Sequence, residues 1–186
     1  MHKTRNKKES ADLMLLLKIN QFPRIILKET DESKIKDFVT KYDAKYYAVR
    51  DMSRANSKLF NLKVEKENLL EYVKHASNYL INVSSFNYVE NQLCTGEIRV
   101  NSDMSLSLTV SNNKTFSARD AVGLPDFNFA SDVYDKKLKK IAGISQVIDY
   151  IFKYRLFDII VEFSSFDRKV GINNENVIIY ELRTDY

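Results

Sequence analysis

Glycine, proline and cysteine are scarce in this chain of 186 residues, and tryptophan is absent. With only four glycines and two prolines, we expect long stretches of regular structure and few tight turns. The same scattered glycines cannot build a Walker-type phosphate loop or a GxGxxG turn, and the sequence contains no GxSxG elbow. Nucleophilic hydrolysis and dinucleotide binding are therefore both disfavoured.

The single cysteine, Cys94, and the two histidines, His2 and His75, limit the disulfide and metal chemistry of the chain. One cysteine excludes an internal disulfide framework and suits a reducing compartment. A zinc site needs cysteine and histidine at ligand spacing, which these distant residues do not provide. The apolar segment 13–17 is too short for a signal-peptide core, and no run approaches the roughly 18 apolar residues of a membrane span. These absences predict a cytoplasmic protein that contacts no membrane.

Positive charge is concentrated at the start of the chain. The formal net charge is +4, and the first eight residues supply all of it, with no acid among them: Lys3, Arg5, Lys7 and Lys8. Residues 9–186 therefore sum to zero, which is +4 minus +4. We expect residues 1–8 to form a basic flexible tail and residues 9–186 to form a single domain. A neutral body with a detachable positive charge disfavours nucleic acid as a partner.

Hydrophobic periodicity predicts a mixture of helices and antiparallel strands. Ile35, Phe38, Val39 and Tyr42 follow the i, i+3, i+4, i+7 pattern of a helix with one buried face, and Thr30-Asp31-Glu32 offers its N-cap. Residues 94–111 alternate apolar and polar side chains on two arms, which predicts an antiparallel hairpin.

The remaining elements complete the expected fold. Helices are predicted at 9–20, 65–76 and 132–154, the last either continuous or broken near Gly143, and strands at 24–28, 45–51, 79–84, 156–163 and 177–184. Segment 112–131 is polar, contains Pro125 and is expected to form a loop. Helices and hairpins mix without strict βαβ alternation, which predicts an α+β fold with a mainly antiparallel sheet and packed helices.

Charged residues on the last two predicted strands form the candidate site. Alternation puts Asp158 and Glu162 on one face of the first strand, and Ile179, Glu181 and Arg183 on one face of the second. If the two strands are neighbours, these charges converge on one surface. Carboxylates there suit a hard metal such as Mg²⁺, and an arginine suits phosphate. The alternative is a cross-strand ion pair of Glu162 or Glu181 with Arg183 that only orders the sheet.

Three short motifs carry a family resemblance. Asp158–Phe163 followed by Val177–Arg183 resembles the end of the ATP-grasp domain of the phosphoenolpyruvate synthase and pyruvate phosphate dikinase group. There, an acidic strand ending in Glu precedes an apolar strand that ends in a polar metal ligand, one residue and Arg. Tyr47–Arg50 is similar to the group's "AVR" strand, whose arginine meets the nucleotide phosphates, and Asn91–Gly96 resembles its Gln-containing strand and small-residue turn. The resemblance covers residues 45–186.

The resemblance implies an ATP-grasp-like fold that binds ATP with Mg²⁺. Because the chain is short, the resemblance implies a reduced relative of that group. Carried over to this sequence, the resemblance assigns Glu162 and Glu181 as metal ligands, and Asp158 lies on the same predicted face. It assigns Arg183 and Arg50 as phosphate contacts, with Arg183 at the reacting group. Two further residues complete the candidate nucleotide site: Lys28, the strand lysine of the N-terminal segment, and Arg119, which together with Asp120 forms either a lid or a solvated loop.

Three functions remain open at this point. The first is a Mg-ATP-binding ligase or phosphotransferase of ATP-grasp type. The second is a non-enzymatic interaction module in which aromatics such as Tyr46 and Tyr88 contact a protein partner. The third, a nucleic-acid binder that uses the basic tail, is the weakest. Whether the chain is an enzyme is not decided by its residues.

Overall fold

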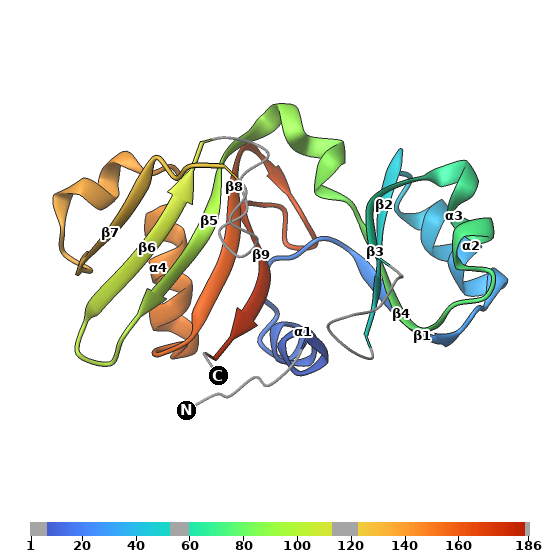
Figure 1. The fold of residues 1–186 in the computed structure, drawn as a ribbon, viewed down its shortest axis with the longest axis horizontal. Helices are drawn as coiled ribbons and strands as arrows, with labels where there is room; N and C mark the ends of the chain where they lie inside the picture. The colour runs from blue at the N-terminus through green and yellow to red at the C-terminus, as the bar shows by residue number, and fades with distance from the viewer. Residues whose placement is uncertain (1–6, 53–59, 113–122, 185–186) are drawn as a thin grey trace. The chain divides into compact units, whose positions relative to one another are not determined.

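The chain divides into two compact units, each described here by itself (Figure 1). The computed structural model describes residues 7–52, 60–112 and 123–184. Unit 1 comprises Met1–Gln21 and Glu90–Tyr186, and unit 2 comprises Phe22–Val89. The single domain expected over 9–186, and the tail expected over 1–8, stay predictions; Lys7 and Lys8 begin the first helix.

Unit 2 is a four-stranded antiparallel sheet with its two α-helices on the same face (Figure 1). The sheet order is β1-β4-β2-β3. Its elements are β1 (Arg24–Glu29), α2 (Glu32–Lys41), β2 (Tyr46–Asp51), β3 (Phe60–Glu65), the 3₁₀ helix η1 (Lys66–Asn68), α3 (Leu69–Val73) and β4 (Ser77–Val83), followed by the 3₁₀ helix η2 (Ser85–Asn91), which leads into unit 1. The face toward the helices is apolar and includes buried Tyr47, Val49, Tyr79 and Ile81.

Helix α2 confirms the strongest local prediction of the sequence. Asp31 is its N-cap, and the Asp31 side chain accepts a hydrogen bond from the Lys34 backbone N–H. Ile35 and Phe38 are buried, as the periodic pattern requires. The cap satisfies a backbone donor that the helix itself leaves unpaired, so the start of this helix is fixed by its own sequence.

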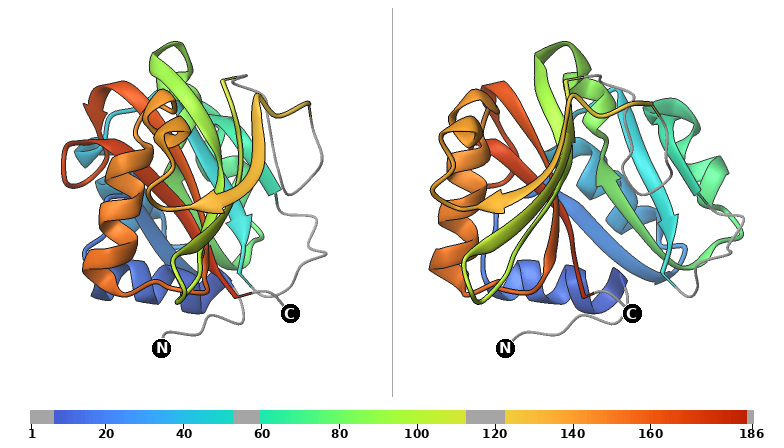
Figure 2. Two further views of the ribbon diagram at one scale, coloured as in Figure 1. Left: turned by 90° about the vertical axis from the view of Figure 1, so that its left-hand side faces the viewer. Right: turned by 60° about the vertical axis from the view of Figure 1, so that its left-hand side comes forward.

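Unit 1 is built on a five-stranded antiparallel sheet of order β7-β6-β5-β8-β9. Its elements are α1 (Lys7–Leu16), β5 (Gln92–Val100), β6 (Ser105–Ser111), β7 (Phe127–Asp132), the 3₁₀ helix η3 (Lys136–Lys140), α4 (Ile144–Tyr154), β8 (Ile160–Val170) and β9 (Glu175–Arg183). Helix α4 lies along one face of this sheet (Figure 2) and buries Ile144, Val147 and Ile151 against it. The α+β class with antiparallel sheets is confirmed.

The long helix expected over 132–154 is broken at Gly143. This glycine has φ 77°, and a Cβ atom there would lie 2.6 Å from Ser165 Cβ. A left-handed backbone and a close neighbour both favour glycine, so the chain turns here and α4 starts at Ile144. The interpretation of two helices rather than one is correct.

Other boundaries differ from the sequence predictions. Strand β7 falls almost entirely in segment 112–131, which was expected to form a loop. Strand β3 was not predicted at all. The helix expected over 65–76 is a 3₁₀ turn followed by the short α3. Strand β7 was not predicted because segment 112–131 is polar and contains Pro125. Strands at the edge of a sheet tolerate polar residues and a nearby proline.

The β9 edge of the large sheet is covered by the start of the chain. The Leu182 backbone N–H donates to Ser10 Oγ (2.8 Å), and the Ile179 N–H donates to the Asn20 carbonyl (3.0 Å). The Asn20 amide nitrogen donates to the carbonyls of Val170 (3.0 Å) and Val177 (2.7 Å) and is fully buried. Within the described ranges, no helix has the length and apolar character needed to cross a membrane.

Candidate functional site

The face of the large sheet opposite α4 carries a row of three glutamates. Glu97 on β5 is the register partner of Glu162 on β8, and Glu162 is the partner of Glu181 on β9. Directly opposed residues of antiparallel strands point to the same face, so the three carboxylates lie side by side. Glu181 is 9% exposed. Like charges placed this closely repel one another, so this row requires positive charge nearby.

A β-bulge in β9 places Glu181 in this row. The register runs from Glu162↔Glu181 to Phe163↔Ile179, which leaves Tyr180 as the extra residue. Ile179 consequently packs in the apolar core while Glu181 and Arg183 lie on the polar face. The prediction that Ile179 shares a face with Glu181 is therefore wrong, because strict alternation takes no account of a bulge.

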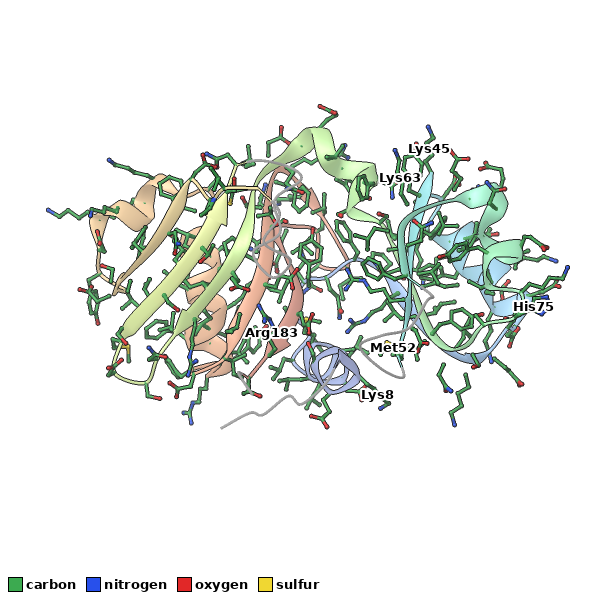
Figure 3. The ribbon with its side chains drawn as sticks, viewed as in Figure 1. Lys8, Lys45, Met52, Lys63, His75 and Arg183 are labelled. Carbon is green, nitrogen blue, oxygen red and sulfur yellow. The ribbon has the colours of Figure 1, made fainter. Side chains whose placement is uncertain are left out.

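Arg183 lies on the same face, one register step beyond the glutamate row (Figure 3). Its Nη2 forms an ion pair with Glu97 Oε2, and the two side chains are 23% and 25% exposed. Among the described residues, the buried Arg183 Nε has no hydrogen-bond partner. Charge pairing of Arg183 was expected from the sequence with Glu162 or Glu181; Glu97 is a partner that sequence reasoning missed.

A small pocket adjoins this charged row. Its volume is about 100 Å³, and its polar lining comes from β5 and β6: Glu97, Arg99, Ser107 and Thr109. Arg99 is in register with Ile160, which is in turn the partner of Arg183, so the two arginines flank Ile160 on the polar face. The face therefore presents both carboxylates and guanidinium groups to a ligand.

Asp158 is placed away from the glutamate row. It precedes β8 with φ 62°, its backbone N–H donates to the Val100 carbonyl (2.8 Å), and its carboxylate accepts from Ser102 N (3.2 Å) and Oγ (2.5 Å). The prediction that Asp158 lies on the strand beside Glu162 is wrong. Asp158 lies in the connection between α4 and β8, where its left-handed conformation and its contacts with Ser102 fix it against the turn between β5 and β6.

The glutamate row offers Mg²⁺ two carboxylates, which suits an ion that is also bound by substrate phosphates. No group of three or more His, Cys, Asp or Glu side chains within 7–52, 60–112 and 123–184 is arranged to hold a metal ion. Glu162 and Glu181 form a cross-strand pair, which is two carboxylates. Mg²⁺ is commonly bound by one or two carboxylates together with substrate phosphates, whereas a metal bound by protein alone needs more ligands.

Unit 2 carries a basic face on the side of its sheet away from the helices. The register Ile26↔Leu80↔Arg50 and the alternation of β1 put Lys28 and Arg50 on this same face. The Arg50 guanidinium lies 5.4 Å from the centroid of the Phe60 ring, which is 54% exposed. Within the described part of the chain, the buried Arg50 Nε has no hydrogen-bond partner. Arg119 and Asp120 lie outside the described residues.

The cysteine, the described histidine and the two candidate partner tyrosines lie outside the glutamate row. Burial raises the pKa of the Cys94 thiol, which lies 3.2 Å from the Ala142 carbonyl oxygen and 3.1 Å from Ser165 Oγ. His75 follows α3 and is exposed. Tyr88 stacks on Phe22, and Lys45 and Lys63 lie over the Tyr46 ring at 4.9 and 5.0 Å. These contacts engage both aromatics that were expected to meet a partner.

Comparison with solved structures identifies the fold. No family model and no curated protein matches the sequence. D-alanyl-alanine synthetase A from Vibrio cholerae is similar, with a TM-score of 0.53, 13% identity and coverage of 96% of this chain and 55% of that one. Macrocyclase MdnC from Microcystis aeruginosa, bound with precursor peptide MdnA, is similar with a TM-score of 0.52 and 10% identity, over 95% of this chain and 51% of that one. The ADP complex of N5-carboxyaminoimidazole ribonucleotide synthetase is similar with a TM-score of 0.52 and 9% identity, over 99% of this chain and 45% of that one.

These neighbours are proteins of the ATP-grasp fold, so the chain has an ATP-grasp-like fold. At this level of identity the likeness extends to the fold alone. The chain spans about half the length of the structures that it matches.

Proposed function

We propose that the chain binds ATP as its Mg²⁺ complex and acts as an ATP-grasp-type ligase or phosphotransferase. The observation that carries the proposal is the register of Glu162 with Glu181 on one sheet face, with Arg183 one step beyond. The named enzymes of similar fold support it, since two of them are synthetases and one was solved with ADP. The narrower relation to the phosphoenolpyruvate synthase group rests on the sequence motifs of the terminal strands and of Arg50.

Glu162 and Glu181 would hold the magnesium ion, which supplies charge neutralisation for the nucleotide phosphates. Two carboxylates leave most coordination positions to phosphate oxygens and water. We therefore expect metal binding to depend on the nucleotide. Asp158 takes no part in this set, because its carboxylate accepts hydrogen bonds from Ser102.

Arg183 is the proposed catalytic residue. A guanidinium in contact with the transferring phosphoryl group stabilises its charge without a proton transfer. The Glu97 ion pair restrains the Arg183 side chain, so the guanidinium is held in one position before the nucleotide arrives. Arg50, Lys28 and Arg119 are the proposed further phosphate contacts. We also propose a cytoplasmic location, which suits the single buried thiol.

A thermal-shift titration with ATP tests the proposal. At about 100 times Kd, a ligand adds about 2.7 kcal/mol to the free energy of unfolding, which raises Tm by about 5–10 °C at this chain length. The rise should require Mg²⁺, and Glu162→Gln, Glu181→Gln and Arg183→Ala should each remove it without unfolding the protein. Asp167→Asn and Arg168→Ala change exposed residues of β8 and serve as matched controls.

The competing function is a protein-interaction module without catalysis. Exposed rings favour it at two positions of unit 2, Phe60 (54%) and Phe86 (39%). Absence of any Mg-ATP shift, together with full retention of fold, would reject the nucleotide proposal and leave this alternative.

A further inference from the structure

The free edge of the large sheet is a place where another chain can add. Strand β7 ends the order β7-β6-β5-β8-β9 and pairs with β6 on one side only (Figure 1). The opposite edge, β9, receives backbone hydrogen bonds from Ser10 and Asn20. Across the described ranges, no backbone hydrogen bond joins β7 to a partner on its outer side. Among the described residues, β9 is therefore covered on its outer side and β7 is not.

The sequence of β7 does nothing to block this edge. Natural edge strands usually carry lysine or proline, or a bulge, because an unpaired edge invites pairing with other chains. In unit 2, the edge strands β1 and β3 carry Lys28 and Lys63. Strand β7 reads Phe-Asn-Phe-Ala-Ser-Asp, with no lysine, arginine or proline, and its register with β6 is regular from end to end.

Strand β7 is also packed firmly on its inner side. Phe127 and Phe129 pack against the apolar core of unit 1, and Thr109 Oγ1 lies 3.4 Å from Asn128 Oδ1 on the neighbouring strand. A strand held in place on its inner side loses little conformational freedom when a second strand pairs with its outer side. The edge is therefore preorganised to accept an extended peptide.

Four exposed lysines stand at the C-terminal end of this strand. They belong to η3: Lys136, Lys137, Lys139 and Lys140. Leu138 between them is buried (3% exposed), which anchors the turn, and Ser131 Oγ of β7 donates to Asp135 Oδ2 (2.6 Å), which joins η3 to the strand. Residues 132–140 contain four lysines and two aspartates, for a net charge of +2.

The two aspartates of this segment are engaged in holding the turn. The Asp135 carboxylate accepts from Ser131 Oγ and the Lys137 N–H, which lowers its pKa, and the Asp132 carboxylate accepts from the Tyr134 N–H. The four lysines are exposed, and Tyr134 of the same segment is 80% exposed. Charge complementarity selects an acidic partner.

We propose that β7 binds an extended acidic peptide segment as a sixth strand of the sheet, with acidic side chains of the peptide against the η3 lysines. Backbone hydrogen bonds to β7 give the affinity, and the lysines select the charge of the peptide. This surface consists of residues other than those assigned to the nucleotide, so the inference does not depend on the proposed function.

The test uses a fluorescein-labelled peptide of about eight alternating valine and glutamate residues, close to the length of a typical strand, and measures fluorescence anisotropy. Lys136→Glu/Lys137→Glu should weaken binding at least about tenfold, from the loss and reversal of two ion pairs. Lys153→Glu/Lys169→Glu, a matched change of two exposed lysines of unit 1, should leave binding within about twofold. Glu162→Gln should bind the peptide as the unchanged chain does.

Backbone methylation of the peptide tests the strand geometry without altering the protein. N-methylation at every valine and at every glutamate blocks opposite edges of the peptide, so one of the two peptides should lose binding and the other retain it. Amide exchange should slow within residues 127–132 on binding. Equal binding by both methylated peptides, protection confined to η3, tighter binding of an oligothymidylate of equal charge, or self-association of the chain through β7 would each overturn the proposal.

Discussion

Replacing Glu97 by glutamine tests whether the Arg183 ion pair stabilises unit 1. The two side chains are 25% and 23% exposed, so the pair lies between a surface ion pair and a buried one. Exposed pairs contribute about 0.2–1 kcal/mol, and breaking a fully buried pair costs about 3–5 kcal/mol. Because some water still reaches both groups, and because removing one of three neighbouring carboxylates relieves repulsion, we expect a loss of about 1–2 kcal/mol.

The assay is urea unfolding followed by circular dichroism, since the chain has no tryptophan. Asp12→Asn is the matched control within unit 1, because it removes an ion pair with Lys8 in which the side chains are 51% and 65% exposed. The control should lose clearly less stability than Glu97→Gln, because water screens a pair in which both side chains are more than half exposed. Equal losses in the two variants, or no loss in Glu97→Gln, would refute the inference that the Arg183 pair restrains the site.

Three further outcomes follow from the packing of unit 1. A Cβ at Gly96 would lie 2.2 Å from the Thr109 carbonyl oxygen, so Gly96→Ala should force β5 and β6 apart and cost about 2–3 kcal/mol of unfolding free energy, measured by urea unfolding. Asn20→Ala leaves two buried carbonyls without their donor and should cost about 1–3 kcal/mol in the same assay; Asn173→Ala, which leaves Asn20 in place, should cost less. The Cys94 thiol should react with a disulfide reagent only after unfolding, and, since burial raises its pKa, stability should fall as pH rises above about 8.5, the unfolded value, an effect that Cys94→Ala removes.

Local features of the fold were predictable because they depend on neighbours in the chain. The Asp31 cap and the spacing of Ile35 and Phe38 define α2 from within its own residues, and the two alternating arms of 94–111 define the β5–β6 hairpin. The break at Gly143 was one of two alternatives, and the left-handed backbone of Gly143 and the proximity of Ser165, both properties of the folded chain, favour it.

The candidate site was predictable in part for the same reason. Period-two alternation correctly put Glu162 on the polar face. Strands β8 and β9 follow one another in the chain and, as expected of consecutive strands, pair in the sheet. The contribution of Glu97 required knowing that β5 pairs with β8, a contact between residues more than sixty positions apart. The bulge at Tyr180 and the turn at Asp158 depend on tertiary contacts as well, which alternation along one strand does not contain.

Glu162 and Glu181 are expected to hold a divalent ion only together with the nucleotide. Mn²⁺ in place of Mg²⁺ makes this measurable by electron paramagnetic resonance, with the protein titrated in the presence and absence of ATP. We expect a protein-bound Mn²⁺ signal that appears only with ATP and is lost in Glu162→Gln but kept in Asp167→Asn. A signal that appears without ATP, or that survives Glu162→Gln unchanged, would contradict this expectation.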